Sequence, residues 1–161
     1  MEKFQSHIYK YIKHSHGSRW KALEFKHSHE VFEPITILSV VDFAENYTFD
    51  PQREIQSEYY HSEQVSIFVH VLYRHSQVSI DGRDNTPWSR DVTKEYHFYV
   101  SDDREHGTLF VQHCFGLICD SFRKNGVSFK EHWIWSDGFA EKFKLTHSFY
   151  WLSHLHKVTR V

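Results

Sequence analysis

Two aspartates stand where apolar segments end, and their type and position could carry chemistry. Asp42 belongs to the segment ITILSVVDFAENY, and Asp137 belongs to KEHWIWSDG. An aspartate at the end of an interior strand loses hydration, so it tends to accept several N–H bonds, pair with a base or coordinate a cation. Two such carboxylates on neighbouring strands would repel each other unless a divalent metal ion lay between them. The pair therefore predicts the kind of site that two-metal nucleases and transposases use.

Each of these acids also has a structural explanation. Asp42 could be a hydrogen-bonded structural residue, and the Ser-Asp-Gly sequence around Asp137 is an ordinary tight-turn sequence. Glu45, which follows Asp42 closely, could supply a further metal ligand or orient Asp42. It could equally cap the turn after the strand or pair with a nearby Lys or Arg.

A second acidic cluster precedes a predicted helix. It comprises Asp102, Asp103 and His106. Helix N-capping explains at least one of these aspartates, because an aspartate before a helix satisfies free backbone N–H groups. A metal role for Asp102 or His106 is the weaker alternative.

The composition is that of one aromatic-rich domain. The chain has 161 residues with 14 Phe, 9 Tyr and 5 Trp, so a bulky core is expected and disorder is not. The net charge of −2 does not indicate nucleic-acid binding, but the first 26 residues are locally basic. This basic face is either solvated or in contact with phosphates. Its residues are Lys3, Lys10, Lys13, Arg19, Lys21 and Lys26.

The cysteines and the hydropathy indicate an intracellular protein. Cys114 and Cys119 are five residues apart in a predicted helix and point to different faces, so neither a metal knuckle nor a disulfide is expected. A reducing compartment is the default, and we expect a nuclear or cytoplasmic location. No apolar run of membrane-spanning length and no signal sequence is present, so no membrane association is expected.

Fifteen histidines suggest zinc, but their spacing argues against a site. Three pairs have i, i+2 spacing, namely His14/His16, His27/His29 and His154/His156. On a helix such residues are about 200° apart and cannot share a metal ion. We therefore expect that folding does not require zinc, and a His-based metal-binding domain is the weakest functional alternative.

Hydrophobic periodicity predicts two helical segments. The first spans residues 3–26 and is predicted to be interrupted at Gly17. The second spans residues 106–125 and is closed by Asn125-Gly126. Its predicted apolar stripe comprises Leu109, Phe110, Cys114, Leu117, Ile118 and Phe122. Residues 1–30 are assigned to an N-terminal helical segment and 31–161 to the core domain.

Four strands are predicted, and their order suggests a topology. Residues 35–43 form a β-branched run that is typical of a central strand covered on both faces. Residues 65–74 and 94–101 follow, joined by a polar segment that looks like a long hairpin or flap, and residues 130–136 form the last strand. A helix before the fourth strand allows that strand to lie parallel to the first by a right-handed crossover. We therefore expect an α/β fold with a ribonuclease-H-like mixed sheet flanked by helices. In such a sheet Asp42 and Asp137 would face one cleft within about 4 to 8 Å.

Several segments resemble a group of transposon-derived proteins. They are DFAENY (42–47), EIQSEYY (54–60), QVSIFVHVLYRH (64–75), VSDDREHG (100–107) and WSDGFAEKFK (135–144). Members look like DDE-type transposases with ribonuclease-H-like cores. The resemblance implies that Asp42 is the first metal-binding carboxylate and Asp137 the second, with Mg²⁺ or Mn²⁺ as cofactor and DNA as partner. Phe139 and Lys142 stand where the family pattern has Cys and Gln.

The family pattern continues beyond the point that this chain reaches. It includes another strand and a Gly-rich HGKG-type segment that bears a further acid. The resemblance therefore implies a partial core that is incomplete at the C-terminus and inactive on DNA as given. The alternative is a non-catalytic DNA- or protein-binding remnant of a transposable element.

Overall fold

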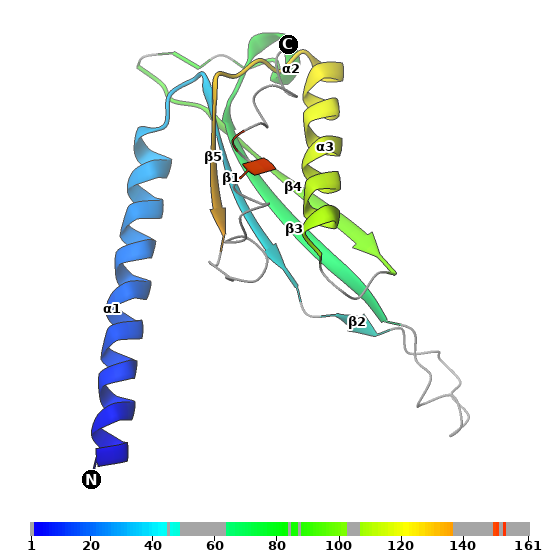
Figure 1. Cartoon of the computed structure of the whole chain (residues 1–161). Coiled ribbons are helices and arrows are strands. Elements are labelled where there is room, and N and C mark those ends of the chain that lie inside the picture. The colour runs from blue at the N-terminus through cyan, green and yellow to red at the C-terminus, as the bar shows by residue number, and fades with distance from the viewer. Residues whose placement is uncertain are drawn as a thin grey trace. The chain divides into compact units, whose positions relative to one another are not determined.

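A computed structural model describes residues 2–44, 46–48, 64–83, 85–86, 88–102, 107–136, 150–151 and 153. The chain divides into two compact units, Met1–Glu33 and Pro34–Val161. Helix α1, Glu2–Val31, lies in the first unit (Figure 1). It runs through Gly17 without a break, so the predicted interruption is wrong. A glycine inside a helix costs only about 1 kcal/mol relative to alanine, which does not end a helix of this length.

The second unit contains the sheet. Strand β3 lies between β1 and β4 and is antiparallel to both, while β5 lies on the other side of β1 and is parallel to it. The short β2 pairs with the first residues of β3. The predicted α/β class with a mixed sheet is confirmed. The strands are β1 Thr36–Phe43, β2 Tyr47–Thr48, β3 Gln64–His75, β4 Val92–Ser101 and β5 Glu131–Ser136.

Helix α3, Thr108–Asn125, packs along one face of this sheet (Figure 1). In one cluster its Ile118 and Phe122 pack with Ile37 of β1 and Leu72 of β3. In the other its residues pack with Val41 and Phe68 of the same two strands. The buried residues of α3 are Val111, Cys114, Phe115, Ile118, Cys119 and Phe122.

The predicted stripe of α3 is wrong in part. Leu109 is 80% exposed and Leu117 is 45% exposed, whereas Phe115 and Cys119 are buried. The helix is therefore rotated by part of a turn from the face that its leucines suggest, and both cysteines are free thiols in the core. The predicted aspartate cap is also wrong, because the N-cap residue is Gly107 and no side chain among the described residues caps the helix.

The loop between β3 and β4 includes a short helix that the sequence did not predict. Helix α2 spans Val78–Asp81 and ends at Gly82, which adopts a left-handed conformation with φ of 65°. Ile80 of this helix packs on the core cluster that contains Ile37. Among the described residues, no helix is both long and apolar enough to cross a membrane.

Two glycines of α3 give a matched test of its ends and interior. Gly126 is the C-cap with φ of 70°, a conformation that L-residues adopt at a cost, so Gly126→Ala should lower the free energy of unfolding by about 1 kcal/mol. Gly116 lies inside the helix and an added Cβ would meet nothing within 4 Å. Gly116→Ala should therefore raise the free energy by about 0.5–1 kcal/mol. Urea unfolding of both variants measures this difference, and equal signs would contradict the assigned cap.

Candidate functional site

The candidate site lies where the parallel strands β1 and β5 end. The last described pair in their register is Val41 with Ser136, and Asp42 is the next residue of β1. On its other side Asp42 is paired with Val69 of β3. Glu45 and Asp137 lie outside the described residues. The structure therefore places one of the three predicted site residues.

The side chain of Asp42 is exposed, so the prediction of a dehydrated, buried aspartate is wrong. Side chains alternate along a strand, and the α3 face of β1 carries Ile37 and Val41. Asp42 consequently points to the opposite face. Its Oδ1 accepts a hydrogen bond of 2.8 Å from the backbone N–H of Phe43. The continuous apolar run in the sequence did not indicate this exposure. Thr36 to Ser39 are buried in succession, whereas Asp42 near the end of the strand is exposed.

Asp42 offers a partial fit to a hard divalent cation. Carboxylate oxygen is the donor that Mg²⁺ and Mn²⁺ prefer, and Mg²⁺ keeps several waters when a protein supplies only one or two carboxylates. Within the part of the chain that the structure describes, no group of three His, Cys, Asp or Glu side chains could hold a metal ion. A complete magnesium site would therefore need Glu45, Asp137 or both. The expectation that zinc is not needed for folding stays a prediction.

A row of polar side chains beneath α3 escaped the sequence analysis. Ser39 of β1 is fully buried, and its hydroxyl lies 2.6 Å from Nε2 of His70 and 2.7 Å from Nε2 of His132. The ring of Phe115 on α3 lies against both imidazoles, with centroid distances of 5.1 and 5.9 Å. One hydroxyl thus joins three strands of the sheet at the centre of the core.

The hydrogen bonds of Ser39 fix the tautomer of at least one of the two imidazoles. A hydroxyl has one proton and can donate it to only one Nε2, so at least one ring carries its proton on Nε2 and donates to Ser39. The Nδ1 atoms of His70 and His132 are buried, and neither has a hydrogen-bond partner among the described residues. Burial lowers the pKa of His70 to about 3, with further lowering by the charges of His132 and His97, and burial lowers the pKa of His132 to about 4. Both rings are therefore neutral at pH 7.

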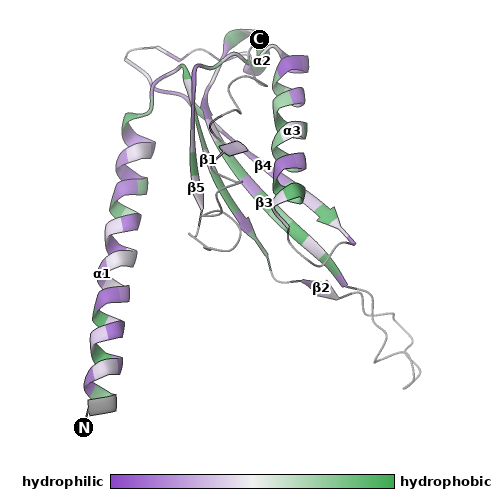
Figure 2. Ribbon diagram, viewed as in Figure 1, coloured by the Kyte–Doolittle hydropathy of each residue, from purple (hydrophilic) through white to green (hydrophobic). Residues whose placement is uncertain are grey.

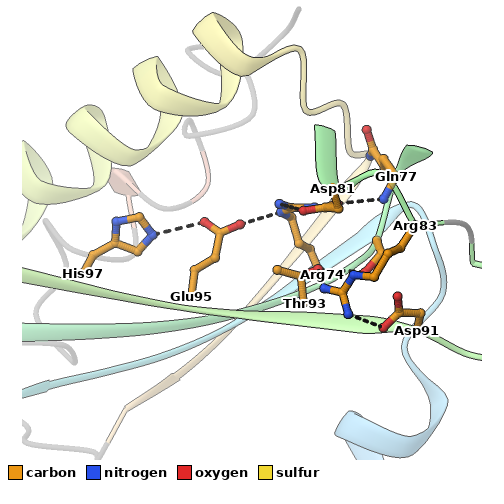
Figure 3. Close-up of polar contacts among 9 residues, drawn as sticks. Arg74, Gln77, Asp81, Arg83, Asp91, Thr93, Glu95 and His97 are labelled. Carbon is orange, nitrogen blue, oxygen red and sulfur yellow. Dashed lines mark hydrogen bonds and ion pairs between the residues drawn. The ribbon is translucent and has the colours of Figure 1, made fainter. Parts of the chain in front are cut away.

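The row continues to a buried arginine at the end of β3 (Figure 3). The guanidinium of Arg74 donates two hydrogen bonds of 2.7 and 2.8 Å to Asp81, and its Nε donates one of 2.7 Å to Glu95. Asp81 also accepts the backbone N–H of Gln77 at 2.8 Å, which holds α2 against the strand. His97 lies 3.3 Å from the second oxygen of Glu95. These contacts join β3, α2 and β4.

Charge pairing sets the protonation of this end of the row. Hydrogen bonds from Arg74 lower the pKa of Asp81 to about 2, against the opposing effect of burial. Hydrogen bonds from His97 and Arg74 lower the pKa of Glu95, and the bond to Asp81 raises that of Arg74. The side chain of Arg74 is only 7% exposed, so the pair is sealed from solvent. Ser39, His70 and Arg74 are buried, and these contacts join strands to one another and to α2. We therefore assign the row to folding and leave Asp42 as the candidate functional residue.

The neutral histidines make stability depend on pH. The unfolded chain binds protons with a histidine pKa near 6.5, whereas His70 and His132 stay neutral in the folded state until the pH falls to about 3 and about 4. The stability that these two neutral histidines contribute is therefore fully present above pH 6.5. Below that pH the free energy of unfolding falls, by up to about 1.4 kcal/mol per pH unit for each histidine. His132→Gln removes one of the two protons taken up on unfolding. Between pH 6 and pH 5 it should therefore make the free energy of unfolding less dependent on pH, by about 1.4 kcal/mol per pH unit. Urea unfolding across this range measures it.

The control for this test is the exposed His113 on α3. His113→Gln should leave the slope as it is in the unmodified chain. A slope that His132→Gln does not change would show that His132 is protonated or solvated in the folded state.

Arg74 should not tolerate lysine. Arg74→Lys keeps the charge but cannot make the two parallel bonds to Asp81 together with the bond to Glu95, so we expect a loss of about 1–3 kcal/mol in the free energy of unfolding. Arg83, whose side chain is 59% exposed and pairs with Asp91, is the matched control. Arg83→Lys should cost less than about 0.5 kcal/mol. Equal thermal shifts for the two variants would contradict the assigned role of Arg74.

Comparison with known proteins supplies a family. No curated protein and no solved structure matches the chain. Residues 21–161 match a domain of unknown function, DUF8701, which covers most of the chain and all of the described sheet. The chain therefore belongs to the DUF8701 family.

Proposed function

We propose that the second unit contains a ribonuclease-H-like core of a metal-dependent polynucleotidyl transferase or nuclease, related to DDE-type transposases. The topology supports this proposal. Strands β1, β3 and β4 form an antiparallel meander, α3 follows, and β5 returns parallel to β1. Such a sheet brings the ends of its first and last strands together at one edge, where acids can share a metal ion.

The register supports an assignment of the metal ligands. One step beyond the pair Val41 and Ser136, the same register would pair Asp42 with Asp137. Neighbouring strands lie about 4.8 Å apart, a separation at which one divalent ion can bridge two carboxylates. We assign Asp42 and Asp137 as the ligands of Mg²⁺ or Mn²⁺, with Glu45 as a further ligand or a residue that orients Asp42.

The proposed chemistry is phosphodiester cleavage or transfer on DNA. Bound Mg²⁺ would supply Lewis acidity at the phosphate and activate a water or a 3′-hydroxyl as the nucleophile. The role of Asp42 is to hold the ion at the strand end, where exposure of its side chain leaves access for a polymer. A location in the nucleus or cytoplasm is part of the same proposal.

A second function is favoured by the surroundings of Asp42. Its carboxylate bonds to the neighbouring backbone N–H, and it belongs to no three-ligand group within the described residues. These observations suit a DNA- or protein-binding domain that keeps the fold without the chemistry. The basic side chains of α1, among them Lys10, Lys13 and Lys21, are exposed and could contact phosphates in that case.

Metal binding and DNA cleavage separate the two functions. Under the first, the chain binds Mn²⁺, and Asp42→Asn or Asp137→Asn weakens binding about tenfold or more, because each removes a charged ligand. Electron paramagnetic resonance of Mn²⁺ measures binding without any need for activity. A supercoiled-plasmid nicking assay with Mg²⁺ and Mn²⁺ then reports whether the bound metal supports cleavage by this chain.

Asp120 of α3 provides the control, because it is an exposed aspartate that pairs only at the helix surface with Arg123. Asp120→Asn should leave Mn²⁺ binding unchanged. Metal binding that survives both site substitutions, or that is absent from the unmodified chain, would overturn the metal-dependent function. Plasmid binding without Mn²⁺ binding would support the second function.

A further inference from the structure

Strand β4 forms an edge of the sheet with an unusual surface. It is ten residues long, contains no proline, and pairs with β3 alone among the described strands. Its outer backbone edge can therefore accept another strand. Figure 2 shows stretches of hydrophobic residues along both β3 and β4.

The side chains of β4 that point away from α3 are large and exposed. Tyr96 is 56% exposed, Phe98 is 63% exposed and Val100 is 62% exposed. They alternate with Glu95, His97 and Tyr99, and of these Tyr99 packs on both core clusters. An open backbone edge beside three exposed apolar side chains is a feature that soluble domains ordinarily blunt with charge, proline or a bulge. Among the described residues no second strand pairs with β4, and on the face of Tyr96, Phe98 and Val100 the strand carries charge at Lys94.

We propose that β4 is a self-association surface, on which a second copy of this chain adds its own β4 in antiparallel orientation to form a continuous sheet across a two-fold axis. The proposal is independent of metal binding and of nuclease chemistry. An antiparallel strand pair is symmetric, so one exposed edge is enough to build the interface from two identical surfaces. Backbone hydrogen bonds would supply the pairing, and the side chains would select the register.

Charge and shape select one register. With Phe98 on the two-fold axis, Phe98 lies opposite its copy and Tyr96 lies opposite Val100. Lys94 then lies opposite Asp102, and this pair occurs twice. Asp102 is exposed and directly follows β4, and the ammonium of Lys94 lies 4.7 Å from the Tyr96 ring centroid on the same face.

Neighbouring registers pair these residues less well. A register centred on His97 sets Lys94 opposite Val100, and one centred on Tyr96 sets Lys94 opposite Phe98, so both leave the charge of Lys94 uncompensated. The register centred on Phe98 also keeps the two copies of Glu95 apart, because each faces Ser101. Opposite charges and aromatic pairs directly across strands stabilise a sheet, whereas like charges destabilise it. This self-complementarity is why we assign a second copy rather than an unrelated peptide.

The test is a charge reversal with rescue. Analytical ultracentrifugation of the full chain over a concentration series should show a monomer–dimer equilibrium. Lys94→Asp and Asp102→Lys should each raise the dimer dissociation constant about tenfold, since each turns two opposite-charge pairs into like-charge pairs. The double variant Lys94→Asp/Asp102→Lys restores opposite pairs and should return the constant to near that of the unmodified chain. Phe98→Lys, which sets two like charges on the axis, should give a monomer.

Leu109 is the control, because it is exposed and apolar but belongs to α3, which packs on the sheet face opposite to Phe98. Leu109→Lys should leave the dimer intact. Under oxidising conditions Phe98→Cys should form a covalent dimer and Leu109→Cys should not, which tests the register without relying on charge. A monomer at every concentration would overturn the proposal, and a double variant no better than the single ones would overturn the register.

Discussion

The packing of α3 on one face of the sheet determines which residues form the core of the second unit. Its buried residues recur at intervals of three and four, so they form one continuous stripe that meets the inward side chains of β1, β3 and β4. A strand exposes alternate residues to opposite faces, and the position of this helix therefore decides which residues become core. Phe68 and Phe115 are buried for this reason, whereas Phe98 and Tyr96, equally large and aromatic, remain exposed.

The same packing buries polar side chains, which then require hydrogen-bond or ion-pair partners inside the core. His70 and Arg74 alternate with Phe68 and Leu72 on the α3 face of β3, so burial of the apolar pair buries the polar pair as well. Asp81 and Glu95 compensate the charge of Arg74, so the short helix α2 supplies one of the two acids that this buried arginine pairs with. His70 is compensated incompletely, because its second nitrogen lacks a partner among the described residues, and it meets this cost by remaining neutral.

Hydrophobic periodicity predicted the positions of the long strands and of α3, but it did not predict how deeply each side chain is buried. The four long strands and α3 lie within a few residues of their predicted positions, since β-branched runs and a glycine C-cap are strong local signals. The two-residue β2 and the four-residue α2 were missed because elements of that length depend on partners elsewhere in the chain. The buried face of α3 was predicted incorrectly because exposed and buried leucines look the same in a sequence. Leu109 and Leu117 therefore fit the pattern of core residues although both are exposed. Two of the three candidate site residues, Glu45 and Asp137, fall outside the described residues, so the sequence remains the source of their assignment.

Asp42 and the apolar side chains of β4 are exposed for the same physical reason. Both lie on the sheet face opposite α3, where the side chains of β1 and β4 alternate outward. An aspartate on such a face keeps its hydration, which lowers the cost of binding a hydrated Mg²⁺ but also weakens the field that would hold the ion in place. A sheet extended across β4 would lengthen this face from one copy to the next without covering the end of β1, since β3 separates the two strands. Self-association through β4 is therefore compatible with access to Asp42, and the two surfaces can be altered independently.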